Sequence, residues 1–556
     1  MSQPAEQANA EETLLHVVRG FLDELGGSPA PLTPTADLER DLGLGSLERA
    51  ELLSRVEQAF GLRLPDSALS DAHTPASLLE LATGPVAGPV RVPQIAVAGR
   101  AAPPLAVPAS GRLPLQAQTL VEVARFRAEA DGERPHIRLP GDAGAEVVLT
   151  FGELWEEALR VATGVGSLGL RPGDRVVLML ATGADFFRAF LGVLCAGCVP
   201  VPIDPPLRAA GLGAYLDRQA RLLDNARPAA LLAEPGLRRV ARLLAERAVG
   251  TPVVTTVPAL AAAPVEGVVR PSPDALGVIQ YTSGSTGDPK GVALSHRAML
   301  ANVRAIGRGL DLTAGDVAVN WLPLYHDMGL IGGWLTALYH GIPVVALSPL
   351  DFLSRPERWL WAFHRYRGTA SPAPNFAFDL CCRKIPDSAL AGLDLSSWRA
   401  ALCGAEPVRP ETLERFIHRF EPYGFRREAM LPVYGLAETS AAFTLTPPGR
   451  GPRYDRVERS PFLTEGRAEP SDAADALTLV SSGRPIPGHE VRVVDPDAPD
   501  RDLPERQQGK ILFRSPSVME GYYQRPEATA AVRVGEWIDT GDLGYLAQGE
   551  LFVTGR

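Results

Sequence analysis

The sequence predicts an α/β protein with mostly parallel layers, preceded by a small all-helical unit, and three observations support this prediction. Downstream of residue 118, helical stretches alternate with short β-branched runs, which is typical of parallel α/β layers. Upstream of residue 84, apolar residues recur at helical spacing. Between the two, the 35 residues 84–118 contain 7 Pro, 4 Gly, 8 Ala and no acidic residue, which indicates a linker. We therefore expect one domain over residues 1–83 and another over residues 119–556.

The helical unit is expected to contain three helices. The first carries Leu14, Leu15, Val18, Phe21, Leu22 and Leu25 on one face. A loop over residues 33–45 follows, and a second amphipathic helix starts at Ser46. A short third helix is expected over residues 75–81.

In the larger unit, helices are expected over residues 151–164 and 185–195, next to strands over 175–180 and 199–203. Further strands are expected over 253–257, 275–281, 343–347 and 491–494, and the final residues, 551–556, also read as a strand.

Charge is unevenly distributed. Residues 1–83 hold 14 acidic and 5 basic side chains, a net −9, while the other residues hold 51 acidic and 50 basic ones, a net −1, which together give −10. Because residues 84–556 are close to neutral, nothing in their charge indicates nucleic-acid binding. The acidic first unit suggests a module that basic surfaces of partners recognise, with a merely solubilising face as the alternative. Only three lysines occur, Lys290, Lys384 and Lys510.

Several features indicate a cytoplasmic protein without a membrane span. The polar, acidic start does not resemble a signal peptide. Residues 328–350 lack charged side chains over 23 positions, but the sequence HGIP at 340–343 interrupts them, so we expect a buried helix and a buried strand. The five cysteines, an odd number, do not form a disulfide framework.

Two motifs carry little functional weight. The sequence GVGSLG at 164–169 matches a dinucleotide-binding pattern, but it ends a predicted helix instead of opening one. Cys195 and Cys198 have no second cysteine pair at ligand spacing and lie in an apolar segment, so buried thiols are expected.

The strongest chemical signal is YTSGSTGDPKG at residues 281–291, directly after a predicted strand. Small residues let backbone amides approach phosphate oxygens, hydroxyls add donors, and Lys290 supplies a cation. The segment does not fit a Walker loop. Taken alone, it could also be a surface turn.

This segment resembles the phosphate loop of the adenylate-forming enzymes, which include acyl-CoA synthetases, peptide-synthetase adenylation domains and luciferases. Further segments follow in that family's order: residues 194–204, WLPLYHDMG at 321–329, CGAE at 403–406, YGLAET at 434–439, residues 509–526 and DTGDLG at 539–544. The resemblance covers about residues 119–556. It implies that family's large N-terminal domain, with layered α/β subdomains and a β-rich subdomain.

The resemblance implies a reaction of a carboxylate with ATP that gives an acyl-adenylate and pyrophosphate, with Mg²⁺ as a cofactor. The phosphate-binding residues would be Thr282, Ser283, Gly284, Ser285, Thr286, Gly287 and the catalytic Lys290. Glu438 would be a catalytic residue and the metal ligand. Gly404, Ala405, Glu406, Tyr434 and Gly435 would frame the adenine, Asp542 and Arg556 would bind the ribose, and His326 would face the acyl carboxylate. A surface acid, a turn cap and a core histidine are the alternatives for Glu438, Asp542 and His326.

Residues 348–360 and 371–380 are similar to one branch of the family, the fatty acyl-AMP ligases, which implies a fatty acid substrate. An apolar pocket for the alkyl chain could be lined by Trp334, Leu338, Phe352, Trp359, Phe376 and Phe378, with an ordinary core as the alternative. Between Glu438 and Gly483, 45 positions apart, lies a charged stretch at 449–469. It resembles the insertion that these ligases carry and that is thought to disfavour coenzyme A as acceptor.

The sequence DLGLGSL at residues 41–47 resembles the phosphopantetheine site of acyl carrier proteins, with Ser46 as the attachment residue. Ser46 begins a helix, where amide donors favour a phosphate, although an N-cap serine would look the same. The residue before the serine is usually Asp and is Gly45 here. The implied partners are a phosphopantetheinyl transferase, the chain's own or a separate carrier protein as acceptor, and a downstream polyketide or peptide synthase.

In the family, a small C-terminal domain with a catalytic lysine follows the hinge that Gly555 and Arg556 resemble. The sequence ends there, so weak adenylation and impaired transfer are expected. The alternatives to a fatty acyl-AMP ligase are a fatty acyl-CoA ligase and a non-catalytic module that binds nucleotide and acyl chain.

Overall fold

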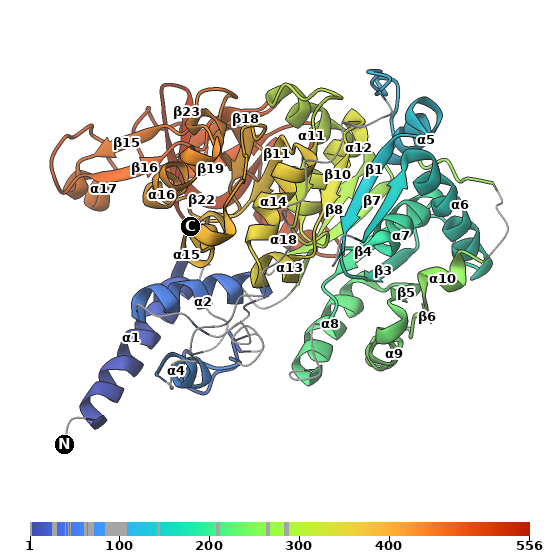
Figure 1. The fold of residues 1–556 in the computed structure, drawn as a ribbon, viewed down its shortest axis with the longest axis horizontal. Coiled ribbons are helices and arrows are strands. Elements are labelled where there is room, and N and C mark those ends of the chain that lie inside the picture. Colours follow the sequence, from blue (N-terminus) through green and yellow to red (C-terminus); the bar gives the residue numbers. More distant parts are fainter. Residues whose placement is uncertain are drawn as a thin grey trace.

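The structure, a computed structural model, describes residues 3–24, 31–38, 41–42, 44, 46–60, 64, 72–83, 108–141, 145–206, 212–262, 267–282 and 289–556. The first unit, blue in Figure 1, contains the helices α1 (Gln3–Glu24), α2 (Ser46–Phe60) and α4 (Pro75–Thr83). Its core is made by Val18 of α1, Val56 of α2 and Leu78 of α4, each with no exposed surface. The three predicted helices are confirmed, and α1 begins earlier than its apolar face indicated.

The large unit begins to pack before its first helix, α5 (Leu120–Asp131). The Ser110 amide donates to Asp131 (2.7 Å), and the Arg127 guanidinium donates to the carbonyl of Arg112 (2.9 Å). Residues 108–118 of the predicted linker are therefore attached to this unit. The rest of that linker, residues 84–107, lies outside the described residues.

A four-stranded parallel sheet has the order β4-β3-β5-β6. Its strands are β3 (Arg175–Met179), β4 (Val199–Ile203), β5 (Ala230–Ala233) and β6 (Val253–Thr255). It lies between the helices α6 (Phe151–Ser167) and α7 (Ala184–Cys195) on one face and α8 (Leu212–Ala226) and α9 (Arg238–Arg247) on the other. Val176 and Val177 pack on opposite faces because successive side chains of a strand alternate.

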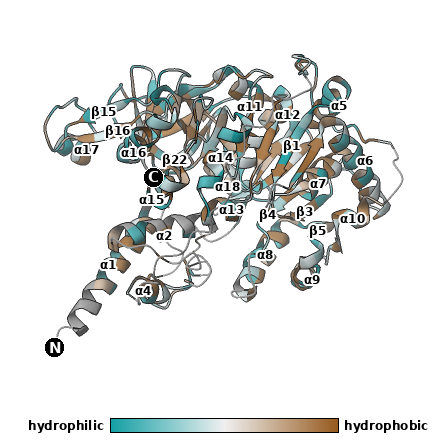
Figure 2. Cartoon of the chain, in the orientation of Figure 1, coloured by the Kyte–Doolittle hydropathy of each residue, from teal (hydrophilic) through white to brown (hydrophobic). Residues whose placement is uncertain are grey.

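A nine-stranded sheet with the order β17-β14-β13-β12-β11-β9-β10-β1-β2 forms the centre of the molecule. Its strands are β1 (Pro135–Pro140), β2 (Glu146–Thr150), β9 (Ala318–Asn320), β10 (Val344–Ala346), β11 (Ala370–Ala373), β12 (Ala400–Cys403), β13 (Met430–Tyr434), β14 (Thr444–Leu445) and β17 (Arg484–Pro485). Neighbours from β13 to β1 are parallel, and the pairs at both edges are antiparallel. Figure 2 shows strands such as β1 and β3 in the hydrophobic colour, whereas the covering helices carry both colours.

Two core clusters cover opposite faces of this sheet, as the alternation along β10 shows. Val344 packs with α5, α11 (His296–Gly309), the π-helix η3 (Met328–Leu335) and α12 (Thr336–His340). Val345 packs with α14 (Glu357–Tyr366), α15 (Asn375–Lys384) and α16 (Pro410–Phe420). We call these the η3 face and the α15 face.

The remaining strands form smaller sheets. The β-rich part, red in Figure 1, contains β18 (Glu490–Val494), β19 (Gly509–Arg514), β21 (Arg533–Val534), β22 (Trp537–Ala547) and β23 (Glu550–Gly555). A three-stranded sheet contains β7 (Leu276–Thr282), β8 (Lys290–Ser295) and β20 (Gly521–Tyr522), and a two-stranded one contains β15 (Tyr454–Val457) and β16 (Leu477–Val480). Short helices are α10 (Val257–Leu260), α13 (Pro349–Ser354), α17 (Arg459–Glu465), α18 (Pro526–Ala531), η2 (Pro235–Leu237), η4 (Asp387–Ala389), η5 (Glu421–Tyr423), η6 (Arg427–Ala429) and η7 (Ala437–Thr439).

Most predicted elements lie within a few residues of those found. The strand predicted over 253–257 ends at Thr255 because Pro258 is in the first turn of α10. Residues 328–350 form η3, α12 and β10, as the interrupted apolar stretch indicated. In the part of the chain that the structure describes, no helix is both long and apolar enough to cross a bilayer. All five cysteines are buried thiols, and burial raises the pKa of Cys195 to about 12.

Candidate active site

The carboxyl ends of four strands of the central sheet carry most of the predicted site residues. His326 lies beyond β9, Phe376 beyond β11, Gly404 beyond β12, and Tyr434 ends β13. Because β9, β11, β12 and β13 are parallel neighbours, these segments meet at one edge of the sheet. Ligands of open α/β sheets bind at this kind of edge.

The segment from Gly404 to Glu406 is held tightly against its neighbours. A Cβ atom on Gly404 would lie 2.7 Å from the carbonyl oxygen of Val433, and Ala405 has a left-handed backbone with φ of 67°. The Glu406 carboxylate accepts a hydrogen bond from the Phe376 amide at the start of α15 (2.6 Å). Directly after the next strand, β13, a Cβ on Gly435 would lie 1.8 Å from the carbonyl oxygen of Ala441. The backbone of both segments therefore needs glycine to pack this closely.

The predicted phosphate loop joins β7 to β8, where Thr282 and Lys290 are cross-strand partners. Residues 283–288, which include Ser283, Gly284, Ser285, Thr286 and Gly287, lie outside the described residues. The Lys290 ammonium lies 5.3 Å from the ring centre of Tyr522, a cation–π contact that fixes its direction. Tyr522 is on β20, which pairs with β8.

Glu438 lies in η7, after β13, and is bound on the side chain and the backbone. Its carboxylate accepts from the Tyr522 hydroxyl (2.7 Å), and its carbonyl accepts from the Met519 amide (2.9 Å). Burial raises the pKa of Glu438, the hydrogen bond from Tyr522 opposes this rise, and the charge of Asp327 adds to it. Lys290 and Glu438 therefore both contact Tyr522, Lys290 through the ring and Glu438 through the hydroxyl.

Tyr434, Asp542 and Arg556 form the second part of the site. The Tyr434 hydroxyl donates to Asp542 Oδ2 (2.6 Å), and Arg556 Nε lies 3.6 Å from Asp542 Oδ1. Asp542 is on β22 and Arg556 follows β23, which pairs with β22 so that Leu543 faces Gly555. Burial raises the pKa of Asp542, against the hydrogen bond from Tyr434 and the charge of Arg556. Burial, with the charge of Asp542, also raises the pKa of Tyr434 well above its ordinary value.

His326 lies next to Asp327, with 2.8 Å between His326 Nδ1 and Asp327 Oδ1. Asp327 also accepts from the Met328 amide (2.6 Å), at the start of the π-helix η3. The Gln280 side chain of β7 donates to the Tyr325 carbonyl and so ties this segment to the phosphate-loop hairpin. The π-helix is a rare element that often occurs at functional sites.

The two parts of the site are close enough to act on each other electrostatically. The charge of Arg556 lowers the pKa of Glu438, and the charge of Glu438 raises that of Tyr434. Tyr434, which donates to Asp542, is also four residues before Glu438. The structure therefore brings Lys290, Glu438 and Asp542 into one region, connected through Tyr522 and Tyr434.

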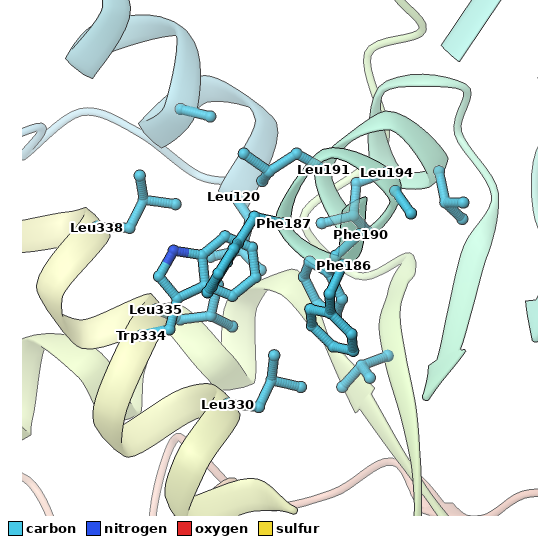
Figure 3. Packing of buried hydrophobic residues seen from close by; sticks show 14 of the residues in the cluster. Leu120, Phe186, Phe187, Phe190, Leu191, Leu194, Leu330, Trp334, Leu335 and Leu338 are labelled. Atoms are coloured by element: carbon cyan, nitrogen blue, oxygen red, sulfur yellow. The ribbon is translucent and has the colours of Figure 1, made fainter. Parts of the chain in front are cut away.

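The predicted acyl-pocket residues do not form one group. Trp334 and Leu338 pack on the η3 face with Phe187 and Phe190 of α7, as Figure 3 shows. Trp334 Nε1 also donates to His136 (3.1 Å), so the polar atom of this buried ring has its hydrogen-bond partner within the core. The others lie on the opposite, α15 face: Phe352, Trp359, Phe376 and Phe378. The expectation of a single shared pocket therefore fails for Trp334 and Leu338, because the sheet separates the two sets.

The charged stretch at 449–469 is attached to the last hairpin, β22–β23. Asp455 of β15 accepts from the Tyr545 hydroxyl (2.7 Å) and from Arg506 (3.0 Å). Glu550 of β23 accepts from Arg450 and from the Ser481 hydroxyl (2.6 Å). The stretch is therefore fixed to the strands that carry Asp542 and Arg556.

Ser46 is the first residue of α2, so its backbone is at a helix N-terminus, as predicted. Gly45 lies outside the described residues. The first-turn amides of a helix favour an attached phosphate.

Three neighbours of the site were not predicted: Tyr522, Asp327 and Gln280. Tyr522 and Asp327 lie inside segments that resemble the family, but nothing in their spacing pointed to these side chains. Gln280 is buried, and its Oε1 has no hydrogen-bond partner. A buried acceptor without a hydrogen-bond partner, in the phosphate-loop hairpin, can be recognised only in the structure.

The residues present fit a nucleoside triphosphate and a hard divalent cation. Lys290 and Arg556 supply positive charge, and Asp542 is a carboxylate able to accept from two ribose hydroxyls. Glu438 is a carboxylate, the kind of ligand that Mg²⁺ prefers, and the charge of Asp327 raises its pKa.

Comparisons with known proteins agree with this arrangement. Residues 125–523 match the model of the AMP-binding enzyme family, and residues 13–82 match the model of the phosphopantetheine attachment site. The medium-chain fatty acid–acyl-carrier-protein ligase JamA of Moorena producens is 35% identical over 460 residues, 79% of this chain and 76% of JamA. The long-chain fatty acid–AMP ligase FadD26 of Mycobacterium marinum is 35% identical over 437 residues, 74% of this chain and 73% of FadD26.

Solved structures show the same likeness. A fatty acyl-adenylate ligase of Legionella pneumophila, crystallised with acyl adenylate and pyrophosphate, superposes with a TM-score of 0.74 and 35% identity. The match covers 80% of this chain and 79% of that one.

Proposed function

The chain belongs to the AMP-binding enzyme family and also carries a phosphopantetheine attachment domain. From this premise we propose that it activates a fatty acid with ATP to an acyl-adenylate, releases pyrophosphate, and passes the acyl group to a carrier-bound phosphopantetheine thiol. In the first step a carboxylate oxygen bonds to the α-phosphorus, and the bond from that phosphorus to the pyrophosphate breaks. In the second, the thiolate bonds to the acyl carbon and AMP leaves.

The observation that carries the proposal is the convergence of Lys290, Glu438 and Asp542. Lys290 contacts the Tyr522 ring, Tyr522 donates to Glu438, and Tyr434, four residues before Glu438, donates to Asp542. These residues come from four separate sequence segments and have the chemistry to hold triphosphate, metal and ribose.

We assign the remaining contacts on the same basis. Thr282 and Lys290, with the hydroxyl and amide groups of Ser283, Gly284, Ser285, Thr286 and Gly287, hold the β- and γ-phosphates. Gly404, Ala405, Glu406, Tyr434 and Gly435 frame the adenine. When bound, Mg²⁺ neutralises charge that develops on the phosphates, and Glu438 is its ligand.

His326 is assigned to the acyl carboxylate. Its neighbour Asp327 lies 2.8 Å away and can hold a proton on His326 Nδ1, which leaves Nε2 to face the substrate. For the alkyl chain we propose the α15 face, with Phe352, Phe376 and Phe378, since Phe352 and Phe376 pack against Trp321 of the segment that carries His326. Trp334 and Leu338 keep a supporting role in the opposite core.

As acceptor we propose the thiol of a phosphopantetheine on Ser46, placed there by a phosphopantetheinyl transferase, with a polyketide or peptide synthase as the next recipient. We also place the reaction in the cytoplasm, where unpaired cysteines such as the five found here remain reduced.

The second candidate is a fatty acyl-CoA ligase. The presence of an attachment domain in the same chain, and the stretch at 449–469 bound to the last hairpin, favour a carrier as acceptor. Incubation with coenzyme A, ATP and fatty acid followed by mass spectrometry separates the two: acyl-CoA as the main product favours the second candidate.

The decisive experiment is intact mass of the chain after incubation with a phosphopantetheinyl transferase, ATP, Mg²⁺ and a panel of fatty acids. We expect the mass of phosphopantetheine and then of an acyl group, both absent in Ser46→Ala. Pyrophosphate release should persist in Ser46→Ala and disappear in Glu438→Gln. A chain that binds nucleotide and fatty acid but releases no pyrophosphate would be a non-catalytic module.

A further inference from the structure

The carrier unit of this chain lies against the large unit at a defined place, where α2 contacts α15. In Figure 1, α2 is directly beside α15, on the side of the molecule that also holds the end of the chain. We infer that the surface of α15 and α16 is a docking site for the chain's own carrier unit, recognised through Glu57 of α2. Docking stands on this contact alone, whereas its use for acyl transfer within one chain rests on the function proposed above.

Glu57 is a carboxylate shared between the two units. Its Oε1 accepts from the Leu64 amide inside the carrier unit (3.0 Å), and its Oε2 accepts from Arg383 of α15 (2.9 Å). The Glu57 side chain is only 4% exposed. A carboxylate hidden from water to this extent needs a charged partner, and the large unit supplies it.

Arg383 is held in place by neighbours in the large unit. Its Nε donates to Asp379 Oδ2 (2.6 Å), and Asp379 Oδ1 accepts from Arg415 of α16 (2.7 Å). Glu57, Arg383, Asp379 and Arg415 therefore form a row of alternating charges across the contact. Because Asp379 orients the guanidinium, little side-chain freedom is lost when Glu57 binds.

The charges of the two surfaces are complementary. The carrier unit has a net charge of −9 over residues 1–83, while α15 ends in Arg383 and Lys384 and α16 ends in His418 and Arg419. Arg419 is engaged by the carbonyls of Cys382 and Ile385, which join the ends of the two helices into one surface. An acidic unit that meets the basic ends of these two helices gains orientation.

The docking contact is connected along two helices to the groups that take part in the proposed reaction. Ser46 and Glu57 lie on the same helix, 11 residues or about 16 Å apart at 1.5 Å per residue. At the other end of α15, the Phe376 amide binds Glu406 of the adenine-framing segment. A carrier docked on α15 is thus attached to the helix that touches the nucleotide side.

Because the two units belong to one chain, a small contact between them is sufficient to keep the docked state populated. Residues 84–107, which join the two units, number 24 and span at most about 80 Å. A tethered partner is present at an effective concentration in the millimolar range, so a contact based on one charge pair and its surroundings can be well populated.

Distances between spin labels test the docking directly. All five cysteines are buried, so Ala59→Cys on α2 and Glu411→Cys on α16, both at exposed positions, give a doubly labelled full chain. We expect a narrow, short distance distribution. Arg383→Gln should lower the docked fraction relative to the undocked one by about tenfold, because it leaves Glu57 without its charged partner.

A double-mutant cycle shows whether the pair itself is responsible. Glu57→Gln keeps an acceptor for the Leu64 amide but loses the charge, so it should undock the carrier without unfolding it. In the Glu57→Gln background, Arg383→Gln should have no further effect. The matched control is Arg242→Gln on the exposed face of α9, at the far end of the large unit in Figure 1, which should leave the distribution unchanged. Additive effects, or a distribution that Arg383→Gln does not change, would overturn the inference.

Dilution of the labelled chain with a fourfold excess of unlabelled chain separates docking within a chain from docking between chains. An unchanged distance supports the inference, and its disappearance would mean that another copy's carrier occupies the site, which overturns it. None of these distances depends on catalysis. Loss of pyrophosphate release with intact docking would reject the proposed function only, and undocked chains with normal release would reject the docking only.

Discussion

Two sets of carboxylates in the large unit, one partly buried and one fully buried, have opposite kinds of hydrogen-bond partner. Glu438 and Asp542, in the candidate active site, are bonded mainly by the hydroxyls of Tyr522 and Tyr434, and burial raises the pKa of both.

Glu550 and Asp316, away from it, are bonded by arginines. Glu550 accepts from Arg450, and Asp316 accepts twice from Arg399 (2.8 Å each). Burial acts against ionisation there too, but the hydrogen bonds outweigh it and the pKa of each is lowered.

The difference separates carboxylates that stabilise the fold from carboxylates available to a ligand. A carboxylate paired with arginine has its charge neutralised inside the protein. A carboxylate held mainly by a neutral hydroxyl keeps lone pairs that a metal ion or a pair of ribose hydroxyls can use. Even at Asp542, Arg556 stays 3.6 Å away, beyond hydrogen-bond distance. The four predictions below test this contrast, in order of expected effect.

The largest effect is expected from Glu438→Gln. It should lower the rate of acyl-adenylate formation by about 10²–10³-fold, because it removes a charge that acts on the reacting phosphates through the metal. The melting temperature should stay equal or rise, since the substitution removes a partly buried charge that burial disfavours. Pyrophosphate release and thermal unfolding measure the two. A large loss of stability would place Glu438 with the structural set.

Glu550→Gln should have the reverse effects, with lower stability and unchanged activity. Glutamine keeps an acceptor for the Ser481 hydroxyl but removes the charge that pairs with Arg450, and we expect unfolding to become easier by about 1–3 kcal/mol, a range reduced because the arginines are partly exposed. Denaturant unfolding gives the value. Pyrophosphate release per folded molecule should be unchanged, and a 10²-fold loss would contradict the contrast.

Tyr522→Phe tests the contribution of the hydroxyl that binds Glu438 in the active site. It removes the hydroxyl donor to Glu438 but keeps the ring against Lys290, so we expect the rate to fall by about tenfold, the usual size for a hydrogen bond to a charged group. Tyr545→Phe, which loses a donor to Asp455, is the matched control away from the site and should leave the rate unchanged.

The smallest effect is a difference in pH dependence. Glu550 has a folded-state pKa below its ordinary value of 4.5, so its stabilisation is present above about pH 4.5 and is lost as the pH falls through the folded-state pKa. Glu438 has a folded-state pKa above 4.5, so the folded state loses stability relative to the unfolded state as the pH rises from 4.5 through that pKa.

Melting temperatures between pH 3 and 8 should therefore diverge. As the pH rises, the melting temperature of Glu438→Gln should increase relative to that of the wild-type protein. The melting temperature of Glu550→Gln should decrease relative to it. Parallel curves for the two variants would show that the two carboxylates share one environment.

Local patterns were sufficient to predict much of the fold. The strand at 199–203 and the helix that begins at Ser46 were predicted at their observed positions, because residue spacing and flanking turns determine them. The faces of the central sheet were not predictable in this way. Trp334 and Phe352 read alike in the sequence, and only the strand pairing places them on opposite sides of the sheet.

The site shows the same division. Motif order indicated the segments that carry Lys290, Glu438 and Asp542, and these lie together. Tyr522 was not found because its bond to Glu438 joins residues 84 positions apart and depends on the pairing of β20 with β8. The contact of Glu57 with Arg383 spans 326 positions and two units, which no local pattern contains.

The scarcity of lysine has a practical consequence for measurement. The three lysines differ in setting: Lys290 lies over the Tyr522 ring, Lys510 is 3.7 Å from Asp539, and Lys384 ends α15. An amine-reactive reagent therefore meets very few nucleophiles on a chain of 556 residues. The extent of labelling at Lys290, read by peptide mapping against the other two as internal standards, reports directly on whether its ammonium is covered.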